Sequence, residues 1–425
     1  MIHIVGVTQT ADVVGNALSA VQQASAVVGS ERQLEIVKPH LVNAQLHTLP
    51  KLTELKSLIC GLSSDDKQQS IVVLASGDPL YYGIGRWFSN NFDRDRLVFH
   101  PAISSIQMAC HRLALSLQDV TVHSVHGRPL ASLRTKLKDS ETLVLLTDKN
   151  STPQALAREC AETGFAQSTI TVLENLSYPH ERVRSFSVDQ LLAEPAFDFD
   201  PLHVSVIEVK ASQNLEGFSL PEFPGIPDTS YITGAKDGKG MITKREVRLC
   251  ILSLMQPSNH DVIWDVGAGC GGVAIELSFW NDKATVYAVE CHEQRLEYLS
   301  ANQQRFGVVQ NLHIIDGQAP ECLSDLPLPN KVFIGGSGGD MTTLLEAIWP
   351  LLPNGGLLVV SAVVPDTKQA LHDFAKQLPA IEMAEVDVVE IAVKRGQFIE
   401  AELDYTAKLP VDVFKFTKRT NSLKV

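Results

Sequence analysis

Short runs of β-branched and other apolar residues alternate with amphipathic stretches along the whole chain. The runs predict buried strands, and the stretches between them, with apolar residues three or four positions apart, predict helices. This alternation is typical of an α/β protein. In the first half the clearest predicted strands are Ile2–Val7, Ile71–Ala75, Val120–Val125, Thr142–Thr147, Thr169–Glu174 and Leu202–Val209.

The regular pattern stops over residues 211–240, which hold three prolines and five glycines. Such a composition is typical of a linker, so we expect one domain at 1–210 and a second at 241–425. The second half restarts with a helix at about Lys244–Met255. Its predicted strands are Val262–Val266, Thr285–Glu290, Leu312–Ile315, Val332–Ile334 and Leu357–Val360, followed by two late runs that could close the sheet, Ala384–Val393 and Ile399–Tyr405.

The length of 425 residues agrees with two or three domains, and 44% hydrophobic and 20% charged residues are typical of a soluble globular protein. A net charge of −13 argues against a nucleic-acid-binding surface, although a locally basic pocket for a small polyanion stays open. The sequence shows no signal peptide and no membrane span, so we expect a cytoplasmic protein. The cysteines form no CxxC pair, and His123 and His126 lack a ligand cluster, so we expect no metal site.

The sharpest chemical signal is a glycine-rich turn that follows the predicted strand containing Asp265. Its glycines are Gly267, Gly269 and Gly271, and a predicted helix follows. Glycines at such a turn allow positive φ angles and let the backbone approach a ligand closely. About 20 residues later Glu290 ends the next strand, where a carboxylate can accept hydrogen bonds from both ribose hydroxyls of a nucleoside.

These features fit either a dinucleotide or S-adenosylmethionine (SAM), and the loop decides between them. It reads D-x-G-x-G-x-G and lacks the G-x-G-x-x-G spacing. A negative Asp265 suits the cationic sulfonium and ammonium groups of SAM and would repel a pyrophosphate. The third strand leads into residues 316–320, where this fold usually contacts the adenine, so we add Gly317 and Ala319 to the expected SAM site.

Several further segments make the second half more specific. They are G-I-P-D at 225–228, I-T-K-R-E-V-R at 242–248, A-P-E at 319–321 and F-I-G-G-S-G-G at 333–339. Together with the glycine-rich turn they resemble the precorrin-6Y C15-methyltransferase (decarboxylating) family over about residues 225–370. This resemblance implies a Rossmann-like class I methyltransferase fold.

The first half carries a different set of motifs. They are S-G-D-P at 76–79, P-A-I-S-S at 101–105, H-G-R at 126–128, E-N-L at 174–176 and E-R at 181–182. This order resembles the tetrapyrrole methylase family over about residues 1–210. The resemblance implies two α/β subdomains with SAM bent in the cleft between them. It also implies that the residues touching SAM are Gly77, Asp78, Ser104 and Ser105.

One turn departs from that family. Its usual G-x-G-P-G sequence after the first strand is replaced here by G-V-T-Q-T at 6–10. A β-branched Thr8 resists the positive φ that a glycine position can require. We therefore expect the first half to bind SAM more weakly than the second half.

The order of the two halves resembles the precorrin-6Y C5,15-methyltransferase (decarboxylating) family. The resemblance implies two SAM sites, methyl transfer to C5 and C15, and loss of CO2 from the ring C acetate, giving precorrin-8. An electron-rich substrate carbon needs alignment and exclusion of water more than a protein nucleophile. Two alternatives stay open: only the second half is catalytic, or the chain is a non-catalytic tetrapyrrole carrier or sensor.

A tetrapyrrole with many carboxylates needs cationic partners inside this acidic protein. Lys244, Arg245 and Arg248 are the candidates, and the alternative is an ordinary solvated helix face. The glycine-rich segment Gly335–Gly339 could bind an anion through its backbone amides or could simply be a packing turn. The partner is therefore expected to be a small tetrapyrrole, with no nucleic acid or membrane, in a homo-oligomeric enzyme.

Overall fold

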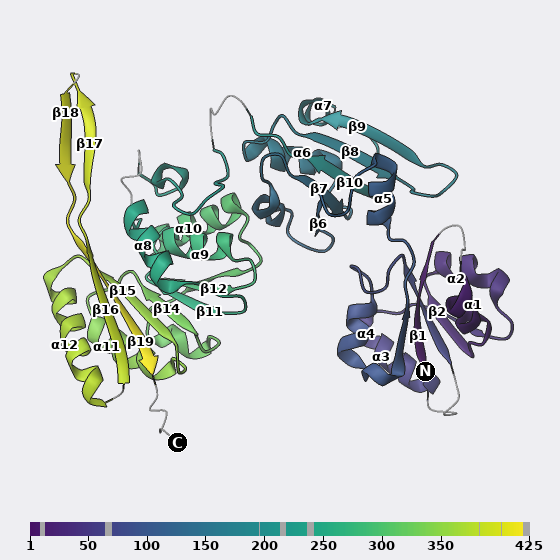
Figure 1. Cartoon of the computed structure of the whole chain (residues 1–425), viewed down its shortest axis with the longest axis horizontal. Helices are drawn as coiled ribbons and strands as arrows, with labels where there is room; N and C mark the ends of the chain where they lie inside the picture. The colour runs from purple at the N-terminus through teal and green to yellow at the C-terminus, as the bar shows by residue number, and fades with distance from the viewer. Residues whose placement is uncertain are drawn as a thin grey trace. The chain divides into compact units, whose positions relative to one another are not determined.

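The computed structural model describes residues 1–8, 13–63, 70–194, 196–212, 218–235, 242–381, 383–400 and 402–419. The chain forms two compact units, both of mixed α/β structure (Figure 1). The first unit comprises residues 1–128, 139–158 and 166–211, and the second comprises 129–138, 159–165 and 212–425. No helix in the described part of the chain is long and apolar enough to cross a membrane.

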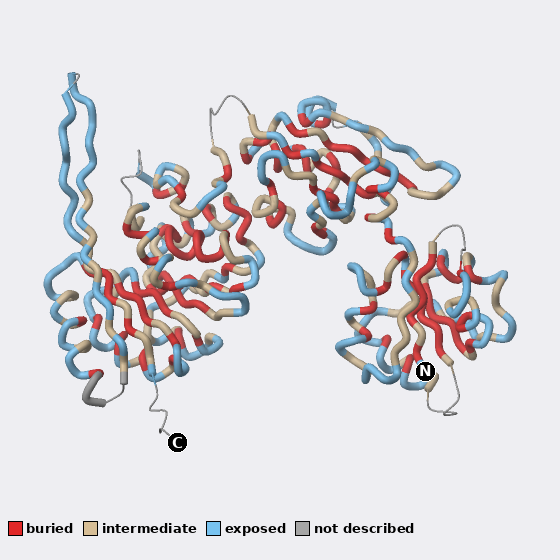
Figure 2. The backbone as a smooth tube through the Cα atoms, viewed as in Figure 1, coloured by how far each residue is buried: buried red, intermediate tan, exposed pale blue. Residues whose placement is uncertain are grey.

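The first unit begins with a five-stranded parallel sheet in the order β3-β2-β4-β1-β5. Its strands are β1 (Ile2–Val7), β2 (Ala26–Gly29), β3 (Gln45–Thr48), β4 (Ile71–Ser76) and β5 (Leu97–His100). Its helices are α1 (Gly15–Gln22), α2 (Glu31–Val37), α3 (Leu52–Ser63) and α4 (Gly85–Asn91), with short 3₁₀ turns at Lys38–His40 and Arg94–Arg96. The central strands are buried on both faces because α1 and α2 pack on one face and α3 and α4 on the other (Figure 2).

A second five-stranded sheet completes the first unit, in the order β6-β7-β10-β8-β9. Its strands are β6 (Thr121–Ser124), β7 (Thr142–Leu146), β8 (Thr169–Glu174), β9 (Arg182–Ser187) and β10 (His203–Glu208). Only β6 and β7 are parallel, and the other neighbours are antiparallel. The associated helices are α5 (Ser105–Leu113), α6 (Pro153–Glu162) and α7 (Val188–Ala193). Helix α5 packs its apolar face on this sheet.

The second unit contains a seven-stranded sheet in the order β13-β12-β11-β14-β15-β19-β16. Its strands are β11 (Val262–Val266), β12 (Thr285–Glu290), β13 (Leu312–Asp316), β14 (Lys331–Ile334), β15 (Leu357–Ala362), β16 (Met383–Ile391) and β19 (Val411–Arg419). Strands β11 to β15 are parallel, and β19 inserts antiparallel between β15 and β16. This is the strand order of class I methyltransferases, as the resemblance predicts.

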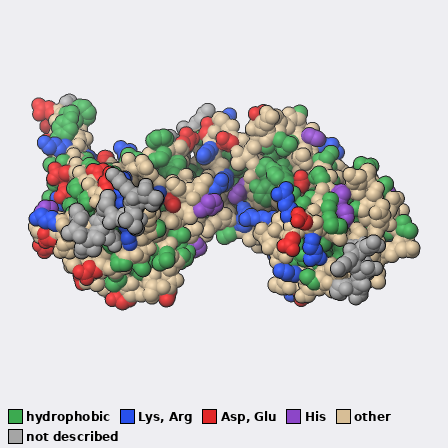
Figure 3. All heavy atoms as spheres, turned by 60° about the horizontal axis from the view of Figure 1, so that its bottom comes forward, with side chains coloured by type: hydrophobic (Ala, Val, Ile, Leu, Met, Phe, Trp, Pro, Cys, Tyr) green, Lys and Arg blue, Asp and Glu red, His purple; other side chains and the backbone are tan. Residues whose placement is uncertain are grey.

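Helices cover both faces of this sheet. They are α8 (Arg245–Met255), α9 (Gly272–Trp280), α10 (Glu293–Phe306), α11 (Met341–Ile348) and α12 (Pro365–Ile381), with 3₁₀ turns at Leu130–Lys136, Asp228–Ser230, Glu321–Asp325 and Trp349–Leu351. A hairpin of β17 (Lys394–Ile399) and β18 (Glu402–Ala407) projects from the sheet, and its residues are exposed (Figure 1, Figure 2). In Figure 3 this arm lies at the upper left, with acidic side chains at its end.

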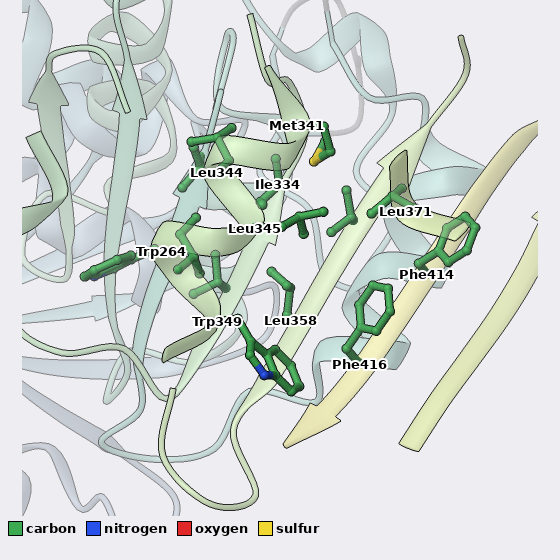
Figure 4. Close-up of a cluster of buried hydrophobic side chains, with 14 of the residues drawn as sticks. Trp264, Ile334, Met341, Leu344, Leu345, Trp349, Leu358, Leu371, Phe414 and Phe416 are labelled. Carbon is green, nitrogen blue, oxygen red and sulfur yellow. The ribbon is translucent and has the colours of Figure 1, made fainter. Parts of the chain in front are cut away.

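One face of the sheet carries a large apolar cluster. Side chains of α11 and α12 meet those of β11, β14, β15 and β19, and Trp264, Trp349, Phe414 and Phe416 are among its largest members (Figure 4). All four are buried. Phe414 and Phe416 come from the antiparallel strand β19, so this strand contributes to the core as well as to the sheet.

Most of the predicted strands are confirmed, but one late run is not in the sheet. Residues 399–405 contain the end of β17 and the start of β18, and the sheet is completed instead by β19. The expected linker 211–240 also differs from the prediction. Its described part at 218–235 belongs to the second unit, with Ile226 and Tyr231 buried there.

Candidate active sites

The glycine-rich turn joins β11 to α9 and needs glycine at three positions. Gly267, Gly269 and Gly271 have φ angles of +73°, +60° and +88°. A Cβ atom on Gly267 would lie 2.5 Å from the carbonyl oxygen of Gly336, and one on Gly271 would lie 2.4 Å from Leu299. The turn therefore packs directly on the segment that follows β14, and a side chain at either position would separate them.

Glu290 ends β12 and holds the glycine-rich turn in place. Its side chain is 4% exposed, and Oε2 accepts a hydrogen bond of 2.9 Å from the amide of Gly269. Oε1 accepts from the amides of Cys291 and His292 at 2.9 and 3.0 Å. The carboxylate thus fixes the loop before any ligand binds. Each carboxylate oxygen can accept two hydrogen bonds, so Oε2 keeps acceptor capacity.

Asp265 differs from the expectation of a fully charged group at the loop. It lies within β11, is 1% exposed, and neither carboxyl oxygen makes a hydrogen bond to the described residues. Burial raises the pKa of Asp265 to about 7, the amide of Ala274 counteracts this only in part, and the nearby Glu290 adds to the rise. Near neutral pH this carboxyl group is therefore only partly ionised.

The segment after β13 lies beside the end of β12. The amide of Gly317 donates to the carbonyl of Glu290 at 3.1 Å, and a Cβ on Gly317 would lie 2.7 Å from that of Cys322. Ala319 packs at the edge of the apolar cluster. The structure thus gathers the expected SAM residues of the second half at the carboxyl ends of β11, β12 and β13.

Arg248 differs from both expectations, because it is neither placed to bind substrate nor part of a solvated helix face. Its side chain has no exposed surface. Nε donates to Glu276 Oε1 at 2.8 Å, Nη1 donates to Asp228 Oδ1 at 2.8 Å and to the carbonyl of Thr243, and Nη2 donates to the carbonyl of Ile226. A guanidinium so enclosed and so fully bonded cannot reach a ligand.

Glu276 explains why the residues before α8 belong to the second unit. This carboxylate on α9 is fully buried and also accepts from the amides of Gly225 and Ile226, at 2.7 and 3.2 Å, and from Trp280 Nε1 at 3.1 Å. Asn302 adds a second attachment, since its amide nitrogen donates at 2.9 Å to the carbonyls of both Ile232 and Cys270. The supposed linker is therefore fastened to the glycine-rich turn.

The other two predicted cations lie at the start of α8. Lys244 precedes the helix and is half-buried, and Arg245 has 46% of its side chain exposed, with its guanidinium 3.9 Å from Glu246. Burial lowers the pKa of Lys244, and the positive charges of Lys408 and Arg395 lower it further. Both candidates thus stay near the surface, unlike Arg248.

The first unit holds a cavity of about 880 Å³ that is lined from both of its sheets. Gly77 and Ser105, two of the residues expected to touch SAM, line it. Asp78 and Ser104 do not line it but shape its wall: Asp78 Oδ1 accepts from the amide of Leu80 at 2.8 Å, and Ser104 caps α5 together with Gln107.

The cavity wall depends on close backbone contacts between three motifs. A Cβ on Gly6 would lie 2.0 Å from the carbonyl oxygen of Gly77, and a Cβ on Gly77 would lie 2.7 Å from the Cα of Ser104. The amide of Gly77 donates to the carbonyl of Val7 at 3.1 Å. Gly6 is therefore required at the altered turn, whereas Gln9 and Thr10 lie outside the described residues.

Three arginines of this cavity were not predicted as site residues, although Arg128 belongs to the H-G-R motif at 126–128. Arg32, Arg86 and Arg128 line it together with His126 and His203, and no described aspartate or glutamate does. The side chains of Arg86 and Arg128 make no hydrogen bond or ion pair with the described residues. The sequence signal that the three arginines share is their position along the chain. Arg32, Arg86 and Arg128 come after the carboxyl ends of β2, β4 and β6 respectively.

The turn that carries Arg128 is fixed by Asp148. Asp148 Oδ2 accepts from the amide of Gly127 at 2.7 Å, and Oδ1 accepts from the amides of Asn150 and Ser151. These amide hydrogen bonds hold the pKa of Asp148 well below its usual range. His126 Nδ1 lies 3.2 Å from the carbonyl oxygen of Thr147, so both ends of the turn are held.

The fold and these sites define a fusion of two different methyltransferases. Residues 5–192 match the family model of the tetrapyrrole (corrin/porphyrin) methylases, and residues 235–418 match that of the precorrin methyltransferase domain.

Comparison with individual proteins makes the family definite. A relative from Sinorhizobium named precorrin-6Y C(5,15)-methyltransferase (decarboxylating) is 32% identical over 399 residues, which cover 94% of this chain and 91% of the relative. A relative of the same name from Mycobacterium tuberculosis is 32% identical over 360 residues, covering 84% and 86%. The chain therefore belongs to the precorrin-6Y C(5,15)-methyltransferase (decarboxylating) family. A crystal structure of a precorrin-6Y C5,15-methyltransferase from Geobacter metallireducens is 32% identical, with a TM-score of 0.41, and covers 46% of this chain and 98% of that one.

Proposed function

We propose that this chain methylates precorrin-6Y at C5 and C15 with SAM and removes CO2 from the ring C acetate, giving precorrin-8 in cobalamin biosynthesis. The observation that carries the proposal is the cavity of the first unit. Three arginines and two histidines line it without any described carboxylate, in a chain whose net charge is −13. Such a lining favours a large polyanion, and a tetrapyrrole with carboxylate side chains has that chemistry.

SAM, when bound, supplies the methyl group, and the chain offers two places for it. In the second unit the proposed residues are Asp265, Gly267, Gly269, Gly271, Glu290, Gly317 and Ala319, and in the first unit they are Gly77, Asp78, Ser104 and Ser105. Support for the second-unit site comes from the glycine-rich turn and from Asp265, whose unpartnered carboxyl group would gain a favourable charge interaction with a cationic ligand.

The protein's part in the reaction is to bind and orient the substrate and to exclude water from the site. Arg86 and Arg128 hold the substrate carboxylates in the first unit, and the aromatic rings of Tyr81 and Tyr82 line the same wall and exclude water from it. Alignment of a reacting carbon with a methyl–sulfur bond accounts for a large share of such a rate enhancement. No protein nucleophile is required.

The test is mass spectrometry of the product formed from precorrin-6Y and SAM labelled in its methyl group. The proposal predicts two labelled methyl groups and the loss of one CO2 from each substrate. One methyl group at C15 together with CO2 loss would support the narrower function in which only the second unit is catalytic, which the altered turn at 6–10 favours. Tight binding with no methyl transfer would support a carrier or sensor.

We also propose that the chain assembles into a homo-oligomer through the β17–β18 hairpin, and that it acts in the cytoplasm without a nucleic-acid partner. A two-stranded hairpin alone is marginally stable in water. This one exposes Phe398 by 78%, Ile399 by 55% and Tyr405 by 59%. Sedimentation of the Phe398→Ser variant tests the assembly, because an unchanged mass would place the interface elsewhere.

A further inference from the structure

The foot of the β17–β18 hairpin stands at the same edge of the sheet as the glycine-rich turn. Strand β19 pairs antiparallel with β15, so that Asp412 near its start lies opposite Ala362 at the end of β15. Ile391 at the end of β16 lies opposite Val411. The hairpin joins the end of β16 to the start of β19, and therefore rises from the carboxyl edge where β11 and β14 also end.

Positively charged side chains gather at this foot. Lys394 and Arg395 begin β17, and Lys408 follows β18, with its amide bonded at 2.9 Å to the carbonyl of Val393. Arg395 Nη2 lies 2.8 Å from Glu246 Oε1 in the first turn of α8, which brings the hairpin against the start of that helix. We call Lys244, Arg245, Lys394, Arg395 and Lys408 the basic foot.

The charge of the basic foot is poorly balanced by its surroundings. Glu246 pairs with Arg395, and Asp228, whose negative charge acts on Lys244, is held by the buried Arg248. Lys394 and Lys408 are exposed and make no ion pair with the described residues. The acidic residues of the hairpin itself lie toward its tip, at Glu400, Glu402 and Asp404 (Figure 3). A surplus of positive charge therefore remains in a strongly acidic chain.

We propose that the basic foot binds the carboxylate side chains of the tetrapyrrole while the second unit acts on it. This inference rests on the proposed function, and to Lys244 and Arg245, which the sequence motifs already include, it adds Lys394, Arg395 and Lys408. From β11 to β19 the sheet spans three strand spacings of about 4.8 Å each, about 14 Å in all. A macrocycle lying along this edge can thus reach the foot with its side chains while its ring faces the glycine-rich turn.

The charged groups of the basic foot can attract the substrate from solution as well as bind it. Lysine ammonium groups on flexible, exposed side chains act as mobile point charges and bind carboxylates in many geometries. Exposed pairs of this kind are individually weak, so the foot works through the sum of its charges. A locally positive field in an acidic protein also raises the encounter rate of a polyanion, and this effect declines as salt increases.

The experiment compares the full-length chain with Lys394→Gln, Lys408→Gln and the double variant. Both lysines are exposed and their side chains have no described partner, so their loss leaves the fold intact. Lys376→Gln is the matched control, because Lys376 is an exposed lysine on α12 and the change in charge is the same. The readout is the KM for CO2 release from precorrin-6Y labelled in its ring C acetate.

We expect each single change to raise this KM roughly threefold and the double change about tenfold, as for exposed ion pairs. The Kd for SAM stays unchanged in all variants, and the KM of the Lys376→Gln control stays at the wild-type value. The difference in KM between the double variant and the wild type narrows at high salt. A KM in the double variant equal to that of Lys376→Gln overturns the inference.

A second readout separates the inference from the proposed function. Binding of uroporphyrin, a tetrapyrrole with carboxylates on every ring, is followed by its own fluorescence and requires no turnover. All variants keep the cavity of the first unit, so a difference between the double variant and the control reports the foot alone. Loss of uroporphyrin affinity in a chain that releases no CO2 would refute the proposed function and support the foot. Equal affinity of both variants, with CO2 release intact, would refute the foot.

Discussion

Replacing Arg248 by methionine tests whether this arginine maintains the fold of the second unit. Methionine keeps an unbranched side chain that can fill the same space, but it removes the charge and every donor. Arg248 and Glu276 both have no exposed side-chain surface, and their Nε and Oε1 atoms are 2.8 Å apart. The variant therefore leaves the Glu276 carboxylate buried without a cation.

The expected loss of stability follows from these contacts. Removing one partner of a buried ion pair costs about 3–5 kcal/mol, because the remaining charge is uncompensated. The carbonyls of Ile226 and Thr243 also lose their donor, whereas Glu276 keeps three neutral donors: two backbone amides and the Trp280 indole. We expect about 4 kcal/mol in all. An arginine on a solvated helix face would cost less than about 0.5 kcal/mol.

Urea unfolding of the full chain, followed by tryptophan fluorescence, measures this difference. Three of the four tryptophans, Trp264, Trp280 and Trp349, belong to the second unit, so the signal reports chiefly on its transition. Arg245→Met is the control, because Arg245 is an exposed arginine on the same helix. The double variant Arg248→Met with Glu276→Gln should be more stable than Arg248→Met alone, since it contains no unpaired buried charge. A cost below about 1 kcal/mol for Arg248→Met would falsify the structural role.

Three further predictions concern the two sites. Because the pKa of Asp265 is raised to about 7, the folded state holds a proton that the unfolded state has lost above about pH 4. The contribution of this group to stability therefore falls as pH rises from about 4 to 7. Asp265→Asn should remove this pH dependence from unfolding curves, and the SAM affinity of the second unit should rise with pH only in the wild type. Gly267→Ala should abolish SAM binding by the second unit in calorimetry, because its Cβ would lie 2.5 Å from the Gly336 oxygen. Arg86→Gln and Arg128→Gln should each raise the KM for C5 methylation roughly tenfold or more while leaving SAM affinity unchanged. If SAM affinity instead fell as much as the KM rose, the substitution would have distorted the cavity.

Features that depend on local sequence were predictable. The β-branched runs became strands at nearly the predicted residues, and the three glycines of the turn have the positive φ angles that their spacing indicates. Strand β19 was missed although V-D-V-F-K-F alternates as a half-buried strand does. The exposed run at 399–405 was predicted as the closing strand instead, because hydrophobicity alone does not distinguish a buried core strand from an exposed hairpin.

Features that depend on tertiary contacts were not predictable. Arg245 and Arg248 are three positions apart on one helix, and only the position of Glu276, 28 residues further along, makes one of them internal. Residues 129–138 also join the second unit, where a Cβ on Gly307 would lie 2.3 Å from the carbonyl oxygen of Ala131. A fragment of the second unit that begins at residue 225 would lack this contact.

The pairing of each arginine indicates whether it can serve a substrate. In the first unit Arg182 and Arg184 both bind the buried Glu174, at 2.7 and 2.9 Å, whereas Arg86 and Arg128 face the cavity without a described partner. An arginine that already pairs with a buried carboxylate must leave it to bind a ligand carboxylate, and the buried charge then left without a cation makes that exchange unfavourable. An unpaired arginine has no such cost, so the full free energy of the charge-assisted hydrogen bond contributes to ligand binding. The same reasoning separates Arg248 from Lys394 and Lys408 in the second unit, so an acidic protein can bind a polyanion with the few cations that its own carboxylates leave unpaired.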